Sequence, residues 1–198
     1  MVESTSSATE PNVRKHRICP WWMGYLLASP IRRLGEKPET ILAGLIETDM
    51  TVLDIGCAMG FFSLPLARMV GAGGRVVCID VQRKMLSSLE RRAGRKGLSD
   101  RIETRLATQD SLGINDLGNR TDFALLMHVV HEVENSARFL GECHAALRPR
   151  ARILIAEPRG HISDEEFEIT RRHTIDAGFN ECKAPEIKKS HVLLCEKI

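Results

Sequence analysis

Two carboxylates and a run of small residues are the groups of this 198-residue chain best suited to hold a small ligand. Asp54 is followed by Gly56, Ala58 and Gly60, and Asp80 comes about twenty residues after that run. Small residues allow a backbone to approach a ligand closely, and a carboxylate can accept hydrogen bonds from both hydroxyls of a ribose. The spacing therefore predicts a site for a nucleoside-bearing ligand, with Asp80 on the ribose.

A second set of polar residues follows two later apolar runs. His128 and His131 come after one run, and Glu157 and His161 come after the other. A histidine or a glutamate tuned toward neutral pH can remove a proton from a nucleophile, so these four are the candidate catalytic residues. Their side chains are also of metal-binding types, but His-x-x-His-Glu has no diagnostic metal spacing and no metal is predicted.

Apolar runs and helical patterns alternate along the chain, as in a doubly wound, mostly parallel sheet. The last two strands are joined by too few residues for a helix, so they are expected to pair antiparallel. Pro38 is expected to open a helix that continues through Ile46, and Ser163 to Glu166 form a capping box for the last helix. The predicted strands are residues 51–55, 75–79, 101–106, 122–127, 152–156, 180–184 and 191–195, with helices near 62–70, 81–93 and 137–147.

The stretch from Asp54 to Gly60 resembles the first motif of the class I S-adenosylmethionine-dependent methyltransferases, and Asp80 matches the acid that ends their second strand. The resemblance runs from about Pro38 to the end of the chain. Residues 146–158 are similar to the small-molecule branch, which includes quinone-biosynthesis and arsenite methyltransferases. It implies a Rossmann-like α/β fold: a seven-stranded, mostly parallel sheet with helices on both faces and a C-terminal antiparallel hairpin. It also implies an enzyme that uses S-adenosyl-L-methionine to methylate a small-molecule acceptor.

The resemblance further implies where each part of the donor would bind. Asp54 would order the loop or reach the ammonium group, and the adenine would lie near the residues that follow the second and third strands. His128 would lie near the transferred methyl group. The cofactor-binding residues expected on this basis are Asp54, Gly56, Cys57, Ala58, Gly60, Asp80, Val81, Gln82, Thr108, Gln109, Asp110 and His128.

The segment before the first strand is expected to divide into a disordered tail, residues 1–13, and a lid, residues 14–37, ahead of a methyltransferase domain at 38–198. Apolar lid residues would exclude water from the reacting atoms. Two alternatives remain: a helix packed on the core, or an interfacial helix with aromatic residues among lipid headgroups. The predicted substrate-pocket residues are Cys19, Trp21, Trp22, Met23 and Tyr25.

Composition limits the partners. A formal net charge of +2 gives no electrostatic reason to expect nucleic acid or a membrane surface, and the Asn/Asp-Pro-Pro-aromatic signature of nucleic-acid methyltransferases is absent. Six scattered cysteines without C-x-x-C spacing indicate a reducing compartment. No secretory signal and no apolar run of about 20 residues is present, so a cytoplasmic protein without an integral membrane segment is expected. A homodimer is compatible with these residues but not required.

Two other functions remain open. Ala58 stands where the family usually has glycine, and Arg150-Ala151 stands where it usually has a glycine pair, so a catalytically silent S-adenosylmethionine-binding protein is one alternative. The other is an NAD-dependent oxidoreductase, whose G-x-G-x-x-G fingerprint differs from the spacing here. An acid about twenty residues on occurs in both folds. Asp54 and the C-terminal hairpin favour the methyltransferase.

Overall fold

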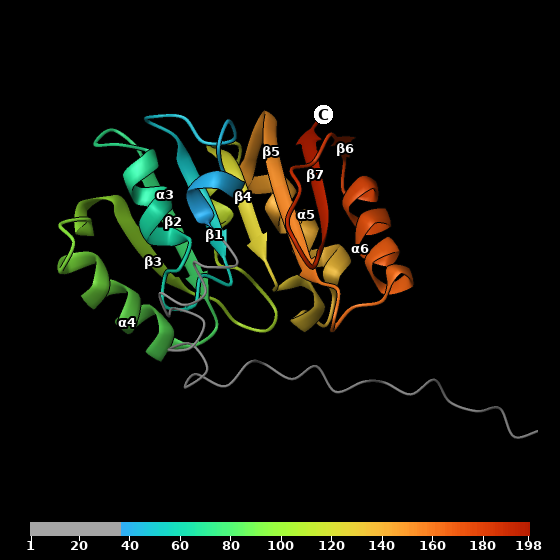
Figure 1. The fold of residues 1–198 in the computed structure, drawn as a ribbon, viewed down its shortest axis with the longest axis horizontal. Helices are drawn as coiled ribbons and strands as arrows, with labels where there is room; N and C mark the ends of the chain where they lie inside the picture. The colour runs from blue at the N-terminus through green and yellow to red at the C-terminus, as the bar shows by residue number, and fades with distance from the viewer. Residues whose placement is uncertain (1–36) are drawn as a thin grey trace, which may run out of the picture.

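The computed structural model describes residues 37–198, which form one seven-stranded sheet between two layers of helices (Figure 1). The strand order is β3-β2-β1-β4-β5-β7-β6. The strands are β1 Thr51–Ile55, β2 Arg75–Asp80, β3 Ile102–Leu106, β4 Thr121–Met127, β5 Leu147–Pro158, β6 Phe179–Cys182 and β7 Ser190–Lys197. The helices are α2 Pro38–Ile41, α3 Ser63–Met69, α4 Arg83–Gly94, α5 Ser136–Ala146 and α6 Asp164–Asp176, with short 3-10 turns η2 Ser99–Arg101, η3 Asn115–Leu117 and η4 Val130–Glu132.

The first five strands are parallel, and β7 pairs antiparallel with both β5 and β6. The expected fold, a mostly parallel sheet closed by an antiparallel hairpin, is confirmed. Only seven residues separate β6 from β7, too few for the helical crossover that a parallel pair needs.

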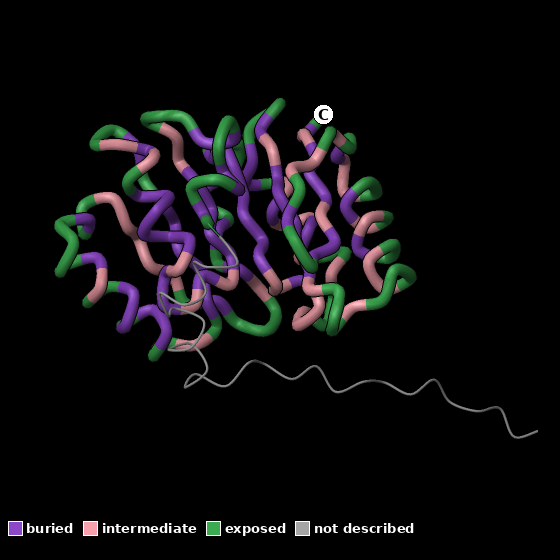
Figure 2. Tube along the Cα trace, viewed as in Figure 1, coloured by how far each residue is buried: buried purple, intermediate pink, exposed green. Residues whose placement is uncertain are grey.

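Alternating side chains of the central strands feed two hydrophobic cores, one on each face of the sheet. Val52 packs into the core beneath α2, α3 and α4, whereas its neighbour Leu53 packs into the core beneath α5. Both are completely buried. A strand covered on both faces must be apolar at nearly every position, which explains the continuous apolar runs in the sequence. Figure 2 shows burial following the strands and exposure gathering in the loops and on the outer helix faces.

Most predicted elements agree with the structure to within about two residues at each end, and two differ by more. The helix at Pro38 was expected to reach Ile46 but ends at Ile41, and Gly44 adopts a left-handed φ of 72°. A helix cannot pass through a residue in that conformation, so the following apolar side chains reach the core from turns. Strand β5 is longer than residues 152–156, because Leu147 already pairs with β4 and an irregularity that includes Arg150 (φ 65°) precedes the regular register.

The capping box is confirmed. The Ser163 hydroxyl accepts from the N–H of Glu166 at 3.2 Å, and the Glu166 carboxylate accepts from the N–H of Ser163 at 2.9 Å. Helix α5 begins in the same way, because the Asn135 side chain accepts from the N–H of Arg138 at 3.0 Å. These caps satisfy donors that have no partner inside the helix.

The topology places the candidate residues on one edge of the sheet. Parallel strands end at the same edge of the sheet. The strand order reverses at β1, because the chain continues from β1 to β2 on one side while β4 lies on the other side. Ligands of open α/β sheets bind where the strand order reverses. The predicted tail, residues 1–13, lies outside the described part of the chain, and so does the predicted lid, residues 14–37, except for Lys37. The predicted pocket residues also lie outside it: Cys19, Trp21, Trp22, Met23 and Tyr25.

Candidate functional site

A cavity of about 1000 Å³ opens at the carboxyl ends of β1, β2, β3 and β4. That volume is at the upper end of the range for pockets that hold one drug-sized ligand, so it has room for a nucleoside and a second small molecule. It is lined by every predicted cofactor-binding residue except Gly60, and by three of the four predicted catalytic ones, His128, His131 and His161.

The loop after β1 turns sharply because Gly56, Ala58 and Gly60 have φ angles of 72°, 46° and 82°. A Cβ on Gly56 would lie 2.7 Å from a methyl group of Val129, and one on Gly60 would overlap Leu89. The left-handed φ strains any side chain at these two positions, and at Gly56 a side chain would also meet the Cβ of Val129 at 2.9 Å. Ala58 holds a conformation that costs a residue with a Cβ about 1–2 kcal/mol.

Asp80 joins this loop to the end of β2. One carboxylate oxygen accepts from the N–H of Ala58 at 3.0 Å, and the other accepts from the N–H of Gln82 at 2.8 Å. A carboxylate has about four acceptor positions, so about two remain for the hydroxyls of a ligand. Burial raises the pKa of Asp80, although the two backbone N–H donors oppose that change.

Asp54 and Cys57 hold the glycine loop, residues 56–60, against α3 and β2. The Asp54 carboxylate, 3% exposed, accepts from the Ser63 hydroxyl at 2.5 Å and so joins β1 to the first turn of α3. Cys57 donates its backbone N–H to Ile79 at 3.1 Å. Burial raises the pKa of the Cys57 thiol well above its ordinary value, which keeps the thiol protonated and unreactive.

Residues 107–112, which follow β3, line the part of the cavity where the adenine is expected. Thr108 organises this segment, because its hydroxyl accepts from the N–H groups of Asp110 and Ser111. Asp110 is 88% exposed and its carboxylate lies 3.7 Å from the guanidinium of Arg138. Val81, which is 40% exposed, also lines the cavity.

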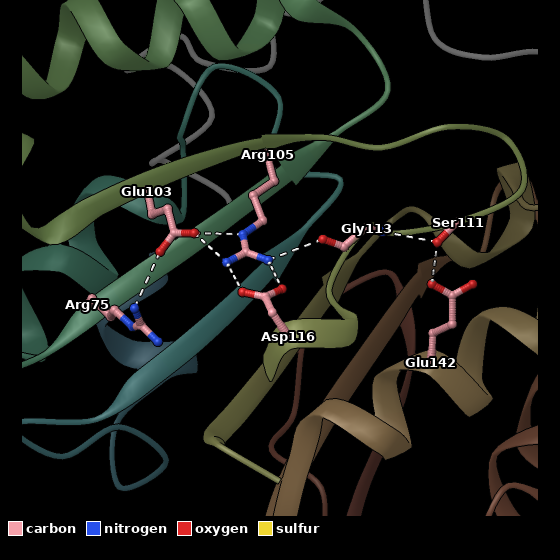
Figure 3. A network of polar contacts seen from close by, with 7 residues as sticks. All are labelled: Arg75, Glu103, Arg105, Ser111, Gly113, Asp116 and Glu142. Atoms are coloured by element: carbon pink, nitrogen blue, oxygen red, sulfur yellow. Dashed lines mark hydrogen bonds and ion pairs between the residues drawn. The ribbon is translucent and has the colours of Figure 1, made fainter. Parts of the chain in front are cut away.

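Helix α5 holds the same segment through Glu142. One Glu142 oxygen accepts from the Ser111 hydroxyl at 3.1 Å and from the N–H of Leu112 at 2.8 Å. Figure 3 shows the contact between Glu142 and Ser111, and also a contact in which Arg105 of β3 donates to the carbonyl of Gly113 at 3.1 Å. The segment that borders the cavity is therefore fixed from two elements that are far apart in the sequence.

His131 and Glu157 form a hydrogen-bonded pair across β4 and β5. The Glu157 carboxylate is 1% exposed; one oxygen accepts from the N–H of Val130 at 2.7 Å and the other contacts Nδ1 of His131. Burial on its own would lower the pKa of His131. The hydrogen bond and charge of Glu157, together with the charges of two nearby glutamates, outweigh burial, so the net effect is a pKa above the ordinary 6.5.

The other two histidines also reach the cavity. His128 adopts φ 61° and donates its backbone N–H to Ala156 at 2.8 Å, which holds the ends of β4 and β5 together. The ring of His161 meets that of His131 edge-on, with centroids 6.4 Å apart. Glu157 differs from the three histidines because it does not line the cavity and touches it only through His131.

Sequence reasoning missed three supporting residues. Arg92, in the last turn of α4, donates to the carbonyl of Met59 in the glycine loop. Ser63 and Glu142 support the loop and the base segment as described above. Only Glu142 carried a visible signal, its spacing of four residues from Arg138, and that spacing does not reveal its partners.

Among residues 37–198, no cluster of three or more His, Cys, Asp or Glu side chains is arranged to hold a metal ion. None of the helices described there is both long and apolar enough to cross a bilayer.

Comparison with known families identifies the architecture around this cavity. A family described as a methyltransferase domain matches residues 46–194, which include β1 through most of β7 and every described residue of the cavity. The chain belongs to this methyltransferase family.

Solved structures and curated relatives agree with this methyltransferase domain. A SAM-dependent methyltransferase from Aquifex aeolicus superposes with a TM-score of 0.80 at 26% identity, over 91% of this chain and 100% of that one. Ubiquinone biosynthesis O-methyltransferases of Rhizobium etli and Bradyrhizobium diazoefficiens are 32% and 29% identical over 143 residues, or 71% of this chain. The chain spans about half the length of these relatives, 53% and 51%.

Proposed function

We propose that this methyltransferase domain transfers a methyl group from S-adenosyl-L-methionine to a small-molecule acceptor. The observation that carries the proposal is the contact between Asp80 and the glycine loop: the Ala58 N–H donates to the same carboxylate that has acceptor positions left for ribose hydroxyls. The Aquifex aeolicus protein, which shares the fold over its whole length, is a SAM-dependent methyltransferase by its description.

The residues present fit this donor. The loop from Asp54 to Gly60 would hold the methionine portion, Asp80 the ribose, and Val81 with the segment 107–112 the adenine. The uncovered Val81 side chain supports an apolar contact with a base. S-adenosyl-L-methionine, when bound, supplies an electrophilic methyl group on a sulfonium.

The acceptor would bind on the β4 and β5 side of the same cavity, where His128, His131 and His161 converge. We assign proton removal to His131, because Glu157 holds its Nδ1 and thereby orients the ring. Glu157 acts through His131 as a positioning residue. The relatives named ubiquinone biosynthesis O-methyltransferase support a small-molecule acceptor.

Calorimetric titration of the full chain with S-adenosylmethionine, S-adenosylhomocysteine and NAD tests the donor assignment. We expect binding of the two sulfur nucleosides in the micromolar range and none of NAD. Asp80→Ala should abolish binding, because it removes the ribose acceptor and leaves the N–H groups of Ala58 and Gln82 without their partner.

The matched control is Asp176→Ala, an exposed aspartate at the end of α6, which should bind like the wild type. Thermal melting of both variants separates a lost ligand contact from a lost fold. A preference for NAD, or no binding of either sulfur nucleoside, would contradict the proposal and favour an ordinary strand–helix turn at residues 56–60.

A further inference from the structure

Two side chains of helix α4 reach the glycine loop. Arg92 donates from its guanidinium to the carbonyl of Met59, and the side chain of Leu89 lies beside Gly60. Residues three apart share one face of a helix, and helical side chains lean toward the helix N-terminus. In α4 that end lies at the cavity, because Met85 of its first turn lines it. Arg92 therefore reaches the loop from the last turn of α4 without itself lining the cavity.

This contact fixes the peptide group between Met59 and Gly60. Its carbonyl accepts from Arg92, and its N–H donates to the carbonyl of Cys57 at 2.9 Å. The three N–H groups before Met59 are bonded to β2. Within the loop, only the N–H of Met59 has no acceptor in the described part of the chain, and Met59 lines the cavity. This N–H is available to an anionic group of a ligand.

The cavity lining around the loop is negative. Asp54 and Asp80 border the loop and line the cavity. Arg138 is the only lysine or arginine that residues 37–198 contribute to the lining, and its guanidinium lies 3.7 Å from the carboxylates of both Asp110 and Glu142. A ligand anion placed at the loop therefore needs a positive charge from outside this lining.

Arg92 supplies that charge from the α4 side of the loop. The residue is half-buried, and its guanidinium forms no ion pair with an acid of the described chain. Burial lowers the pKa of Arg92, but a guanidinium remains protonated in proteins. Because water screens a half-buried charge less than an exposed one, this charge acts on groups several ångströms away. It therefore favours an anion at the N–H of Met59.

We propose that Arg92 is a positioning residue that gives the site its preference for a ligand with a free carboxylate on the methionine portion. The carboxylate accepts from the N–H of Met59, and Arg92 offsets its charge while holding the neighbouring carbonyl. The inference rests on the donor proposed above and adds how the site recognises the amino-acid end of that donor.

Two ligands that differ only in the carboxylate test this role. S-adenosylhomocysteine is compared with its decarboxylated analogue by calorimetric titration of the full chain, with competition between the two for the weaker ligand. The wild type should prefer S-adenosylhomocysteine at least about tenfold. Arg92→Met should bind S-adenosylhomocysteine about tenfold more weakly and the analogue within about twofold of the wild type, because only the first ligand carries the charge that Arg92 offsets.

Two further variants separate the charge from the hydrogen bond. Arg92→Gln removes the charge but keeps a donor group, so it should lose the preference as Arg92→Met does. Arg92→Lys keeps the charge and should retain most of the preference. The matched control is Arg95→Met, which makes the same charge change at an exposed residue directly after α4 and should leave both affinities unchanged.

A purely structural role for Arg92 would give a different result. The N–H of Ala58 donates to Asp80, so a distorted loop would also disturb the ribose contact and weaken both ligands alike. Equal weakening of both ligands, or a preference that persists in an uncharged variant, overturns the inference but leaves the donor site standing. Thermal melting shows which variants are folded, and Arg92→Gln provides the readout if Arg92→Met does not fold. Failure of the wild type to bind S-adenosylhomocysteine overturns the proposed function itself.

Discussion

Glu157 is a buried carboxylate whose two oxygens have different hydrogen-bond partners. One accepts from the N–H of Val130 and fixes the turn after β4, and the other holds His131. Because the carboxylate is 1% exposed, its charge is little screened by water, and it acts strongly on the neighbouring imidazole. The raised pKa of His131 is the measurable consequence.

Replacing Glu157 by glutamine should lower the pKa of His131 below the ordinary 6.5, because burial then acts with less opposition. The charges of Glu132 and Glu166 remain and oppose burial only weakly, and the facing His161 ring contributes no negative charge. An NMR titration of the His131 ring protons measures this change. The ring of His173, which contacts Ser136 instead, provides the internal control.

The same pair makes stability depend on pH. The folded-state pKa of His131 is raised, so the stabilisation by its protonated form is fully present below pH 6.5 and is lost as pH rises through the folded value. Urea unfolding of wild type and Glu157→Gln across that range should show this dependence in the wild type only. An identical pH dependence in both proteins would contradict the assignment.

At the scale of elements, the segment between β3 and η3 is held by Arg105 of β3 and by Glu142 of α5. Arg105 of β3 pairs with Glu103 at 2.6 Å and with Asp116 of η3 (Figure 3), and the hydrogen bond to Asp116 raises the pKa of Arg105 further. Asp116 is 62% exposed, so this pair contributes little stability by itself. Glu142 is 19% exposed and accepts a backbone N–H, so its contact is the more important one for the segment.

Glu142→Ala should loosen residues 107–113 without unfolding the domain. It leaves the N–H of Leu112 and the hydroxyl of Ser111 without their acceptor, a loss of about 1–3 kcal/mol for a buried donor. We expect faster hydrogen exchange in this segment of the unliganded protein and about tenfold weaker binding of S-adenosylhomocysteine.

Glu142→Gln keeps an acceptor oxygen and should restore most of the protection, and the exposed Glu186→Ala provides the matched control. Unchanged exchange at residues 107–113 in Glu142→Ala would show that α5 does not hold the segment.

At the scale of the whole molecule, stability and ligand binding are built at opposite edges of the sheet. Lys197 ends β7 near the start of β5, far from the strand ends that carry the cavity, and it is 7% exposed. Its ammonium donates to Asn119 at 2.9 Å and to the carbonyls of His144 and Leu147 at 2.7 Å each. These bonds join the last strand to the end of α5, where a positive charge is favourable.

Lys197→Met should therefore destabilise the domain by about 1–3 kcal/mol, because two carbonyls and an amide oxygen lose a charged donor in a buried place. Urea unfolding measures the loss, and Lys183→Met on the exposed surface after β6 is the control. Affinity for S-adenosylhomocysteine should stay at the wild-type value. A parallel loss of affinity would mean that the two edges are coupled.

The order and type of the elements, and the glycine loop with Asp80, were predictable from the sequence because they depend on local patterns. Residues such as Val52 and Leu53 belong to a continuous apolar run that only a strand covered on both faces can bury, and Ser163 with Glu166 forms a cap from neighbouring residues. The end of α2 was predicted wrongly, because a helical apolar pattern persists while Gly44 turns the chain away.

Only the tertiary structure decided which polar groups meet. His131 and Glu157 were each candidates by type, but their pairing joins residues 26 apart, one in the turn η4 and the other on β5, and Glu142 reaches Leu112 from 30 residues away. Such partners depend on strand order and on how α5 packs, which local periodicity does not encode. Backbone propensity and apolar spacing act over a few residues and are visible in a sequence. Charge pairing and cavity shape act across the folded chain and exist only after it has packed.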